Sequence, residues 1–352
     1  MPRFDGRLGG VFVGTNSWDE LANYESFELV KRAYEAKHNR EMGTRHSREV
    51  AAPISHANAY FRSARSADLA VKPLLLYYGV LSLSRGLTLF LSRGLREVAL
   101  TPSHGLAISE WGRHLSADNP DFASLEVRTL QSGALADLCK ATGCRSLLRH
   151  NSSGVNYTFV SPEIPAGTTL GLGDILSRIP DIQTHHRRWR DHFLSAQIEN
   201  TTTTDGLLSI KIKKGYGATA ITDAKMLCVN SEFVVQYESH DKATLVGPPE
   251  VSKSPGMTDL IDRRMMNIGD VWLVAAYSAG TTLSKISTLF VLSYLLGMLV
   301  RYYPTQWTAL SRGQINDAAL PTLTAAIDLI ESVYPETVLD FLREVSMSPR
   351  TE

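Results

Sequence analysis

The chain has 352 residues, and its 36 Lys and Arg balance 36 Asp and Glu, so the formal net charge is zero. This balance argues against a protein that holds nucleic acid mainly through a basic surface. Hydrophobic residues make up 43% of the chain and charged residues 20%, which excludes a disordered protein and is sufficient for one large core or two ordinary ones.

The N-terminus, "MPRFDGRLGGVFVG", has no apolar stretch of signal-peptide length behind its charges. The three cysteines, Cys139, Cys144 and Cys228, are too few for a disulfide framework, and their spacing fits no zinc site. We therefore expect a cytoplasmic protein without a metal site or cofactor.

Two helices are predicted first along the chain. The segment 17–39 has Ser17 as a candidate N-cap and Glu20 three residues later, a pattern typical of a capping box. The segment 53–70 continues the helical pattern, with Tyr60 and Phe61 among its apolar residues.

Two longer apolar runs raise the question of membrane helices. Residues 74–91 number 18, just short of the ~20 that cross a bilayer. Arg85 lies inside this run, where a charge costs roughly 2.5–3.5 kcal/mol on the insertion scale. The second run, 286–300, has 15 residues and is followed by Arg301. We predict that both are buried helices of one protein core, and that neither crosses a membrane.

The middle of the chain is predicted to be rich in strands. The segment 124–130 is strand-like, 132–142 helical and 154–161 strand-like, and a short helix ends at Pro180. Further strand-like runs follow and are separated by turn residues. They are 192–200, 207–215, 228–239, 242–248 and 270–278.

Three more helices follow from residue 283, so we predict an α+β protein: a mainly helical body with a β-rich insertion in the middle of the chain. The expected parts are 1–150 (helical, first part), 151–280 (β-rich insertion) and 281–352 (helical, C-terminal part).

Several motifs resemble, in order and spacing, those of the bacterial YaaC-like family. They are "KPLLLYYGVLSLSRGL", "SHGLAISEW", "LGDILSRIPDI" and "LSYLLGMLVRYYPTQW". The resemblance covers about residues 17 to 345 and implies a fold type and a bacterial cytoplasmic setting, but it brings no catalytic residues.

The N-terminal half is also similar to the helical HEPN class, through Tyr77, Tyr78, Leu83, Arg85 and Gly86. Many HEPN proteins are dimeric ribonucleases that use an Arg–His pair. The His takes a proton from the ribose hydroxyl, and the Arg stabilises charge on the phosphate.

Arg145 and His150 are the candidate catalytic pair under this resemblance. Arg149 adds a second cation, and "NSSG" supplies a turn after the pair. The same spacing recurs at four other places in the chain, so the pattern alone does not select this pair. The alternative interpretation is a solvated basic helix end.

The segment "HHRRWRDH" offers candidate nucleic-acid contacts at Arg187, Arg188, Trp189 and Arg190, because an aromatic ring among cations can stack a base while the cations hold phosphate. The alternative is a charged surface connector before a strand.

The polar residues at the ends of the apolar helices suggest a third site. Arg85 stays charged and needs partners when buried. We expect a carboxylate, a carbonyl or a bound anion beside it. Together the residues suggest an anion or nucleotide pocket, and the alternative is a hydrogen-bond cluster that closes the core. They are Arg85, His104, Arg301, Tyr77 and Tyr78.

Two functions therefore remain open. One is a helical module for binding or dimerisation in a bacterial regulatory or phage-defence system, and the other is a metal-independent ribonuclease of HEPN type. For the first we expect a homo-oligomer, a protein partner from the same operon, and RNA or a nucleotide as ligand.

Overall fold

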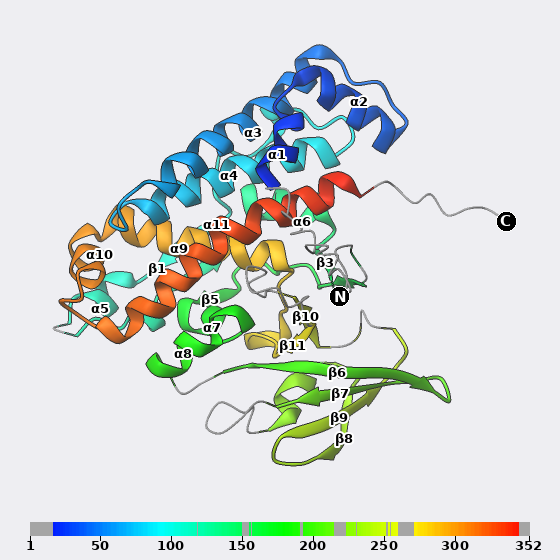
Figure 1. Cartoon of the computed structure of the whole chain (residues 1–352), viewed down its shortest axis with the longest axis vertical. Helices are drawn as coiled ribbons and strands as arrows, with labels where there is room; N and C mark the ends of the chain where they lie inside the picture. Colours follow the sequence, from blue (N-terminus) through cyan, green and yellow to red (C-terminus); the bar gives the residue numbers. More distant parts are fainter. Residues whose placement is uncertain are drawn as a thin grey trace, which may run out of the picture.

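The computed structural model describes residues 17–344, apart from 118, 150–154, 156, 191–192, 215–222, 230, 251–252, 254 and 260–270. Helices occupy both ends of the chain and strands lie mostly between them (Figure 1), which confirms the predicted α+β class. The helices are α1 Ser17–Leu21, α2 Phe27–His38, α3 Thr44–Arg65, α4 Lys72–Leu91, α5 Trp111–Leu115, α6 Ala134–Thr142, α7 Leu172–Leu176, α8 Gln183–Trp189, α9 Lys285–Tyr302, α10 Pro304–Ser311 and α11 Leu320–Arg343.

The first predicted helix is divided in two. Ser17 begins only the five-residue α1, and the longer α2 begins at Phe27. Its N-cap is Ser26, whose side chain accepts a hydrogen bond from the Leu29 N–H group.

The long apolar helices α4 and α9 pack against each other in one hydrophobic core (Figure 1), as predicted. Both are long and apolar enough to cross a membrane by length and composition, but both are mostly buried inside the fold. Glycines allow close contact on both sides of α4. A Cβ on Gly86 would lie 2.6 Å from Ile54 of α3, and a Cβ on Gly297 of α9 would lie 2.6 Å from the Cβ of Tyr77.

Three antiparallel sheets complete the described fold. The largest has the strand order β10-β11-β6-β7-β9-β8, and two smaller ones have the orders β1-β2-β5 and β3-β4. The strands are β1 Leu106–Ser109, β2 Glu126–Thr129, β3 Arg145–Leu148, β4 Tyr157–Val160, β5 Thr169–Gly171, β6 Ser195–Thr204, β7 Leu207–Lys213, β8 Val234–Glu238, β9 Lys242–Gly247, β10 Gly256–Thr258 and β11 Trp272–Val274.

The buried apolar residues form two cores, which do not divide the chain at the expected boundaries. Leu170 and Ile182 lie inside the expected insertion but belong to the core of the helical body. Leu148 precedes the insertion but belongs to the core of the large sheet. A division into separate domains stays a prediction.

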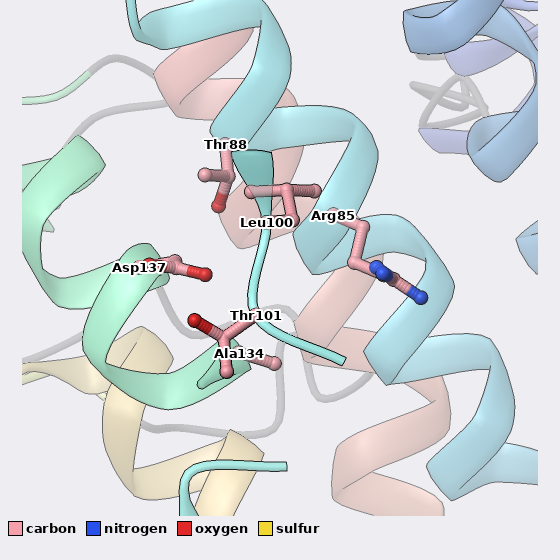
Figure 2. A pocket seen from close by; sticks show the side chains of 6 residues that line it. All are labelled: Arg85, Thr88, Leu100, Thr101, Ala134 and Asp137. Carbon is pink, nitrogen blue, oxygen red and sulfur yellow. The ribbon is translucent and has the colours of Figure 1, made fainter. Parts of the chain in front are cut away.

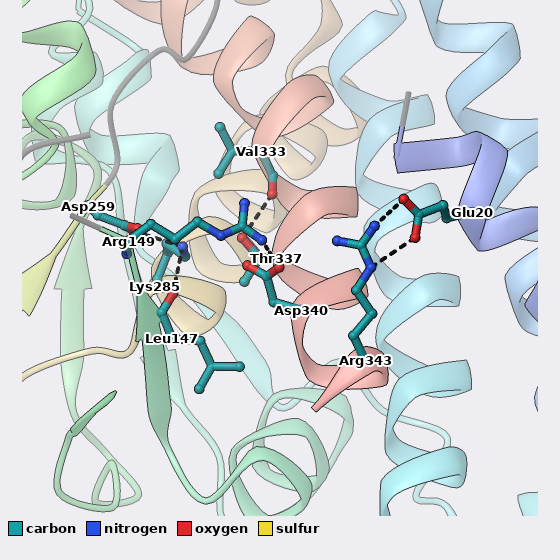
Figure 3. Close-up of polar contacts among 9 residues, drawn as sticks. All are labelled: Glu20, Leu147, Arg149, Asp259, Lys285, Val333, Thr337, Asp340 and Arg343. Carbon is teal, nitrogen blue, oxygen red and sulfur yellow. Dashed lines mark hydrogen bonds and ion pairs between the residues drawn. The ribbon is translucent and has the colours of Figure 1, made fainter. Parts of the chain in front are cut away.

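A buried ionic network connects the large sheet to the helical body (Figure 3). The Lys285 ammonium lies 2.8 Å from the Asp259 carboxylate, and both side chains are only 1% exposed. Asp259 also accepts a hydrogen bond from the Arg149 backbone N–H at 2.7 Å, and the Arg149 guanidinium pairs with Asp340 of α11. The network therefore joins the end of β3, the residue after β10 and helices α9 and α11.

The buried histidines His38 and His46 make the stability of the fold depend on pH. Burial lowers the pKa of His38 and His46. A hydrogen bond between His38 and the Phe90 carbonyl, at 2.9 Å, and the Leu89 backbone near His46 partly oppose the effect. Because the unfolded chain then binds more protons than the folded protein, stability falls as pH drops below about 6.5, the ordinary pKa of histidine.

We expect the melting temperature to decrease between pH 7 and pH 5.5, and to decrease less in a His46→Phe variant. Arg96 and Arg40 lower the His46 pKa further and Glu49 raises it, so these neighbours stay unchanged in the test. Equal pH slopes for the two proteins would contradict the account.

Candidate functional site

Four of the five residues predicted for an anion pocket lie together where α4 meets the end of α9. Tyr77 and Tyr78 belong to the second turn of α4, and Arg301 to the last turn of α9. His104 lies in the loop before β1 and forms a hydrogen bond through Nδ1 with the Tyr77 hydroxyl. The Arg301 guanidinium donates a hydrogen bond to the Tyr78 hydroxyl at 3.1 Å.

Further tyrosines surround these four residues. Tyr294 packs edge-on against Tyr77 with ring centroids 5.4 Å apart, and Tyr60 stacks on Tyr78 at 5.8 Å. The Arg301 guanidinium lies 5.1 Å from the ring centroid of Tyr302, which is 54% exposed. We refer to this group as the tyrosine–arginine site. Its members are Tyr60, Tyr77, Tyr78, His104, Tyr294, Arg301 and Tyr302.

The protonation of the site follows from burial. Burial raises the pKa of the Tyr77 hydroxyl, which therefore stays protonated and donates its proton to His104 Nδ1. Burial, followed by the nearby Arg301 charge, lowers the pKa of His104 and keeps its ring neutral at pH 7. Its proton then lies on Nε2, which has no hydrogen-bond partner among the described residues and is available as a donor.

The charge of the site is positive and uncompensated within the described chain. Arg301 forms no ion pair with any carboxylate whose position the structure describes. The neighbours that shift the pKa of Tyr77, His104 and Tyr294 are Arg301 and other tyrosines, and none is an acid. An arginine among aromatic rings and without a counter-ion favours an anionic ligand that has a flat ring.

The comparison with protein families identifies the chain. The model of the YaaC-like protein family matches residues 20–342, nearly the whole described fold. The chain belongs to this family. Comparisons with curated proteins and with solved structures gave no match.

Arg85, the fifth predicted residue, lies apart from the tyrosine–arginine site. It is half-buried in a separate small pocket beside Thr101 and Asp137 (Figure 2), with its guanidinium turned away from Asp137. It forms no hydrogen bond or ion pair with the described part of the chain. The Arg85 charge acts on the Asp137 carboxylate without a hydrogen bond or ion pair between them. A bound anion as the direct partner of Arg85 stays a prediction.

Arg145, from the predicted catalytic pair, lies in strand β3 and not at a helix end as the sequence suggested. Its guanidinium forms two hydrogen bonds to Glu344, at 2.5 and 2.8 Å, and a third to the Thr142 carbonyl at 3.0 Å. These contacts fix Arg145 against the end of α11. His150 lies outside the described residues, so the pair itself stays a prediction.

The predicted nucleic-acid contacts lie on and just after the short helix α8. Arg187, Arg188 and Arg190 are exposed. Trp189 is half-buried against the core of the helical body, so little of its ring is free to stack a base. Arg190 pairs with Asp121 at 3.4 Å. Nucleic-acid binding here stays a prediction.

Three members of the tyrosine–arginine site, Tyr60, Tyr294 and Tyr302, were not among the five residues predicted for the pocket, and Tyr302 directly follows the predicted Arg301. Tyr294 lies seven residues, or two helical turns, before Arg301 and thus on the same face of α9, a spacing that could have indicated it. Tyr60 reaches the site from α3, and no local pattern signals that contact. Within the described ranges, no cluster of three or more His, Cys, Asp or Glu side chains is arranged to hold a metal ion.

Proposed function

We propose that this YaaC-like protein is a binding module for an anionic ligand of the nucleotide class, held at the tyrosine–arginine site. The observation that carries the proposal is the Arg301 guanidinium, which lies between Tyr78 and Tyr302 and has no carboxylate partner in the described chain. A nucleotide supplies both of the missing parts, a negative charge and a flat ring.

Each side chain has a role in this proposal that follows from its contacts. Arg301 uses one of its five donors on Tyr78, so other donors are available for a phosphate. The exposed ring of Tyr302 offers a face for base stacking, which contributes about 1–3 kcal/mol per base. The His104 Nε2–H group is a neutral donor for a phosphate or base oxygen.

The test compares ATP-induced thermal shifts of the wild type and two arginine variants. At a hundredfold excess over Kd, a ligand stabilises the folded state by about 2.7 kcal/mol. We expect Arg301→Gln to weaken ATP binding by about ten- to a hundredfold, as for loss of a charged hydrogen bond. Arg48→Gln is the matched control, because Arg48 is also exposed and lies 5.5 Å from an exposed ring, that of Phe27.

The proposal fails if Arg301→Gln and Arg48→Gln respond to ATP like the wild type, or if the wild type itself gives no shift.

The ribonuclease alternative gains no support from Arg145, which Glu344 and Thr142 hold. A homo-oligomer, a protein partner and a regulatory or phage-defence setting also stay predictions.

A further inference from the structure

Two cysteines lie at the end of helix α6. Cys139 belongs to the last turn of α6, and Cys144 lies between the end of this helix and β3. The Cys144 N–H donates to the Cys139 carbonyl at 3.0 Å, and the Gly143 N–H donates to the Lys140 carbonyl at 3.4 Å. With Gly143 in the left-handed conformation, these two bonds form a Schellman motif. In this motif the side chains at the positions of Cys139 and Cys144 commonly meet.

The two thiols are in contact within the motif. They form a hydrogen bond with each other, and the Cys144 Sγ also lies 3.8 Å from the Cys139 carbonyl oxygen. Both residues belong to the core of the helical body, with Cys139 8% and Cys144 5% exposed. A disulfide forms readily only where the backbone already brings two cysteines together. The end of α6 meets this condition without refolding.

The backbone of Cys144 is unusual for a cysteine. Its φ is +51°, in the left-handed region that is disfavoured for residues with a Cβ. Glycine or asparagine is the ordinary choice there. Among the described residues, the others with positive φ that are not glycine are all polar: Asn39, Glu110, Asp205 and Asn316. The contact with Cys139 gives a reason for a buried cysteine at this position.

The hydrogen bond between the thiols makes them chemically different. It lowers the pKa of Cys144, against the effect of burial, and raises the pKa of Cys139, in the same direction as burial. Cys144 therefore loses its proton first, and a thiolate is the form of cysteine that attacks an oxidant. Cys139 keeps its proton and lies 3.4 Å from the hydroxyl of Ser287, in the first turn of α9.

We propose that Cys139 and Cys144 form a reversible disulfide, which makes the junction of α6, β3 and α9 sensitive to peroxides. The Cys144 thiolate attacks hydrogen peroxide, the O–O bond breaks, and a sulfenic acid forms. The hydroxide that leaves takes up the proton that Cys144 lost. The Cys139 thiol then displaces the sulfenic oxygen as a second water, and the S–S bond forms. A dithiol reductant restores both thiols by exchange.

The disulfide would fix a point where several elements meet. Cys144 directly precedes Arg145, which binds Glu344 after the end of α11. Cys139 contacts Ser287, whose hydroxyl lies 2.7 Å from that of Ser284, the N-cap of α9. In a reducing compartment such a bond forms transiently and reports the oxidant level, so it differs from the permanent disulfides of secreted proteins.

The experiment measures the equilibrium between thiols and disulfide in glutathione redox buffers, in the native protein and in urea. Thiols are trapped in acid, alkylated and counted by mass spectrometry. Cys228→Ser is studied beside the wild type, because it removes the third cysteine and leaves the pair intact. Cys139→Ser is the matched variant without the pair. If Cys139→Ser does not fold, the first two proteins still decide the result.

We expect the wild type and Cys228→Ser to form the disulfide with an equilibrium constant at least about tenfold larger in the native state than in urea. By linkage, a tenfold preference stabilises the folded state by about 1.4 kcal/mol, so the oxidised protein should melt at a higher temperature than the reduced one. Peptide mapping should place the bond between Cys139 and Cys144.

Three results would overturn the proposal. They are equal constants in the native state and in urea, a bond that includes Cys228, and a disulfide that still forms within the Cys139→Ser chain. None of these results bears on ATP binding at Arg301, which the thermal shift measures under reducing conditions.

Discussion

Replacing Asp259 by asparagine is expected to destabilise the fold by about 3–5 kcal/mol, because it leaves a buried ammonium without its partner. The side chains of Lys285 and Asp259 are each 1% exposed, and the Lys285 ammonium otherwise donates only to the Leu147 carbonyl, at 3.1 Å, within the described chain. The asparagine side chain would keep the shape and could still accept from the Arg149 backbone, so the main loss is the charge. Urea unfolding, followed by circular dichroism, measures the change.

Glu28→Gln is the matched control for this prediction. Glu28 also pairs with a lysine, Lys31, at 3.3 Å, but its side chain is 57% exposed. Solvent screens such a pair, so we expect a loss of under about 1 kcal/mol. If the two variants lost similar stability, the buried network would not be what joins the large sheet to the helical body.

Gly297→Ala is expected to destabilise the protein by about 1–3 kcal/mol through overpacking between α9 and α4. The new Cβ would lie 2.6 Å from the Cβ of Tyr77 and 3.0 Å from its Cγ. These atoms are at the base of the tyrosine, so the side chain cannot simply rotate away. Displacing Tyr77 also disturbs its hydrogen bond to His104, so ATP binding should weaken in the same variant.

Gly112→Ala provides the control in another helix. A Cβ on Gly112 of α5 would meet only the Tyr303 hydroxyl, at 3.9 Å. Alanine is the better helix former by about 1 kcal/mol, so stability should stay level or rise. A Gly297→Ala protein as stable as the Gly112→Ala protein would show that α4 and α9 are less tightly packed than described.

The two apolar helices were predicted well because a long run of apolar residues is visible in the local sequence. The run 286–300 became α9, Lys285–Tyr302, and the run that contains Arg85 became α4, Lys72–Leu91. The segment that begins at Arg145 was mistaken for a helix end because its strand is defined by pairing with another strand, β4. Such pairing depends on residues outside the segment itself and leaves a weak local signal.

The candidate site was partly predictable for the same reason. Tyr77, Tyr78 and Arg301 lie at the ends of the two apolar helices, where polar groups collect, and packing of those helices brings them together. Arg85 was grouped with them, but it lies seven residues after Tyr78, two turns or about 10 Å along α4. The ionic network of Asp259 and Lys285 joins residues across the two cores, and no spacing rule indicates such a contact.

The most direct test of nucleotide binding at the tyrosine–arginine site is a crystal structure of the protein grown with ATP at saturating concentration. The account predicts electron density for the nucleotide at the end of α9, with a phosphate oxygen within hydrogen-bond distance of the Arg301 guanidinium and the base against the ring of Tyr302. A nucleotide bound elsewhere, or a site that stays empty at a concentration that saturates the thermal shift, would contradict it.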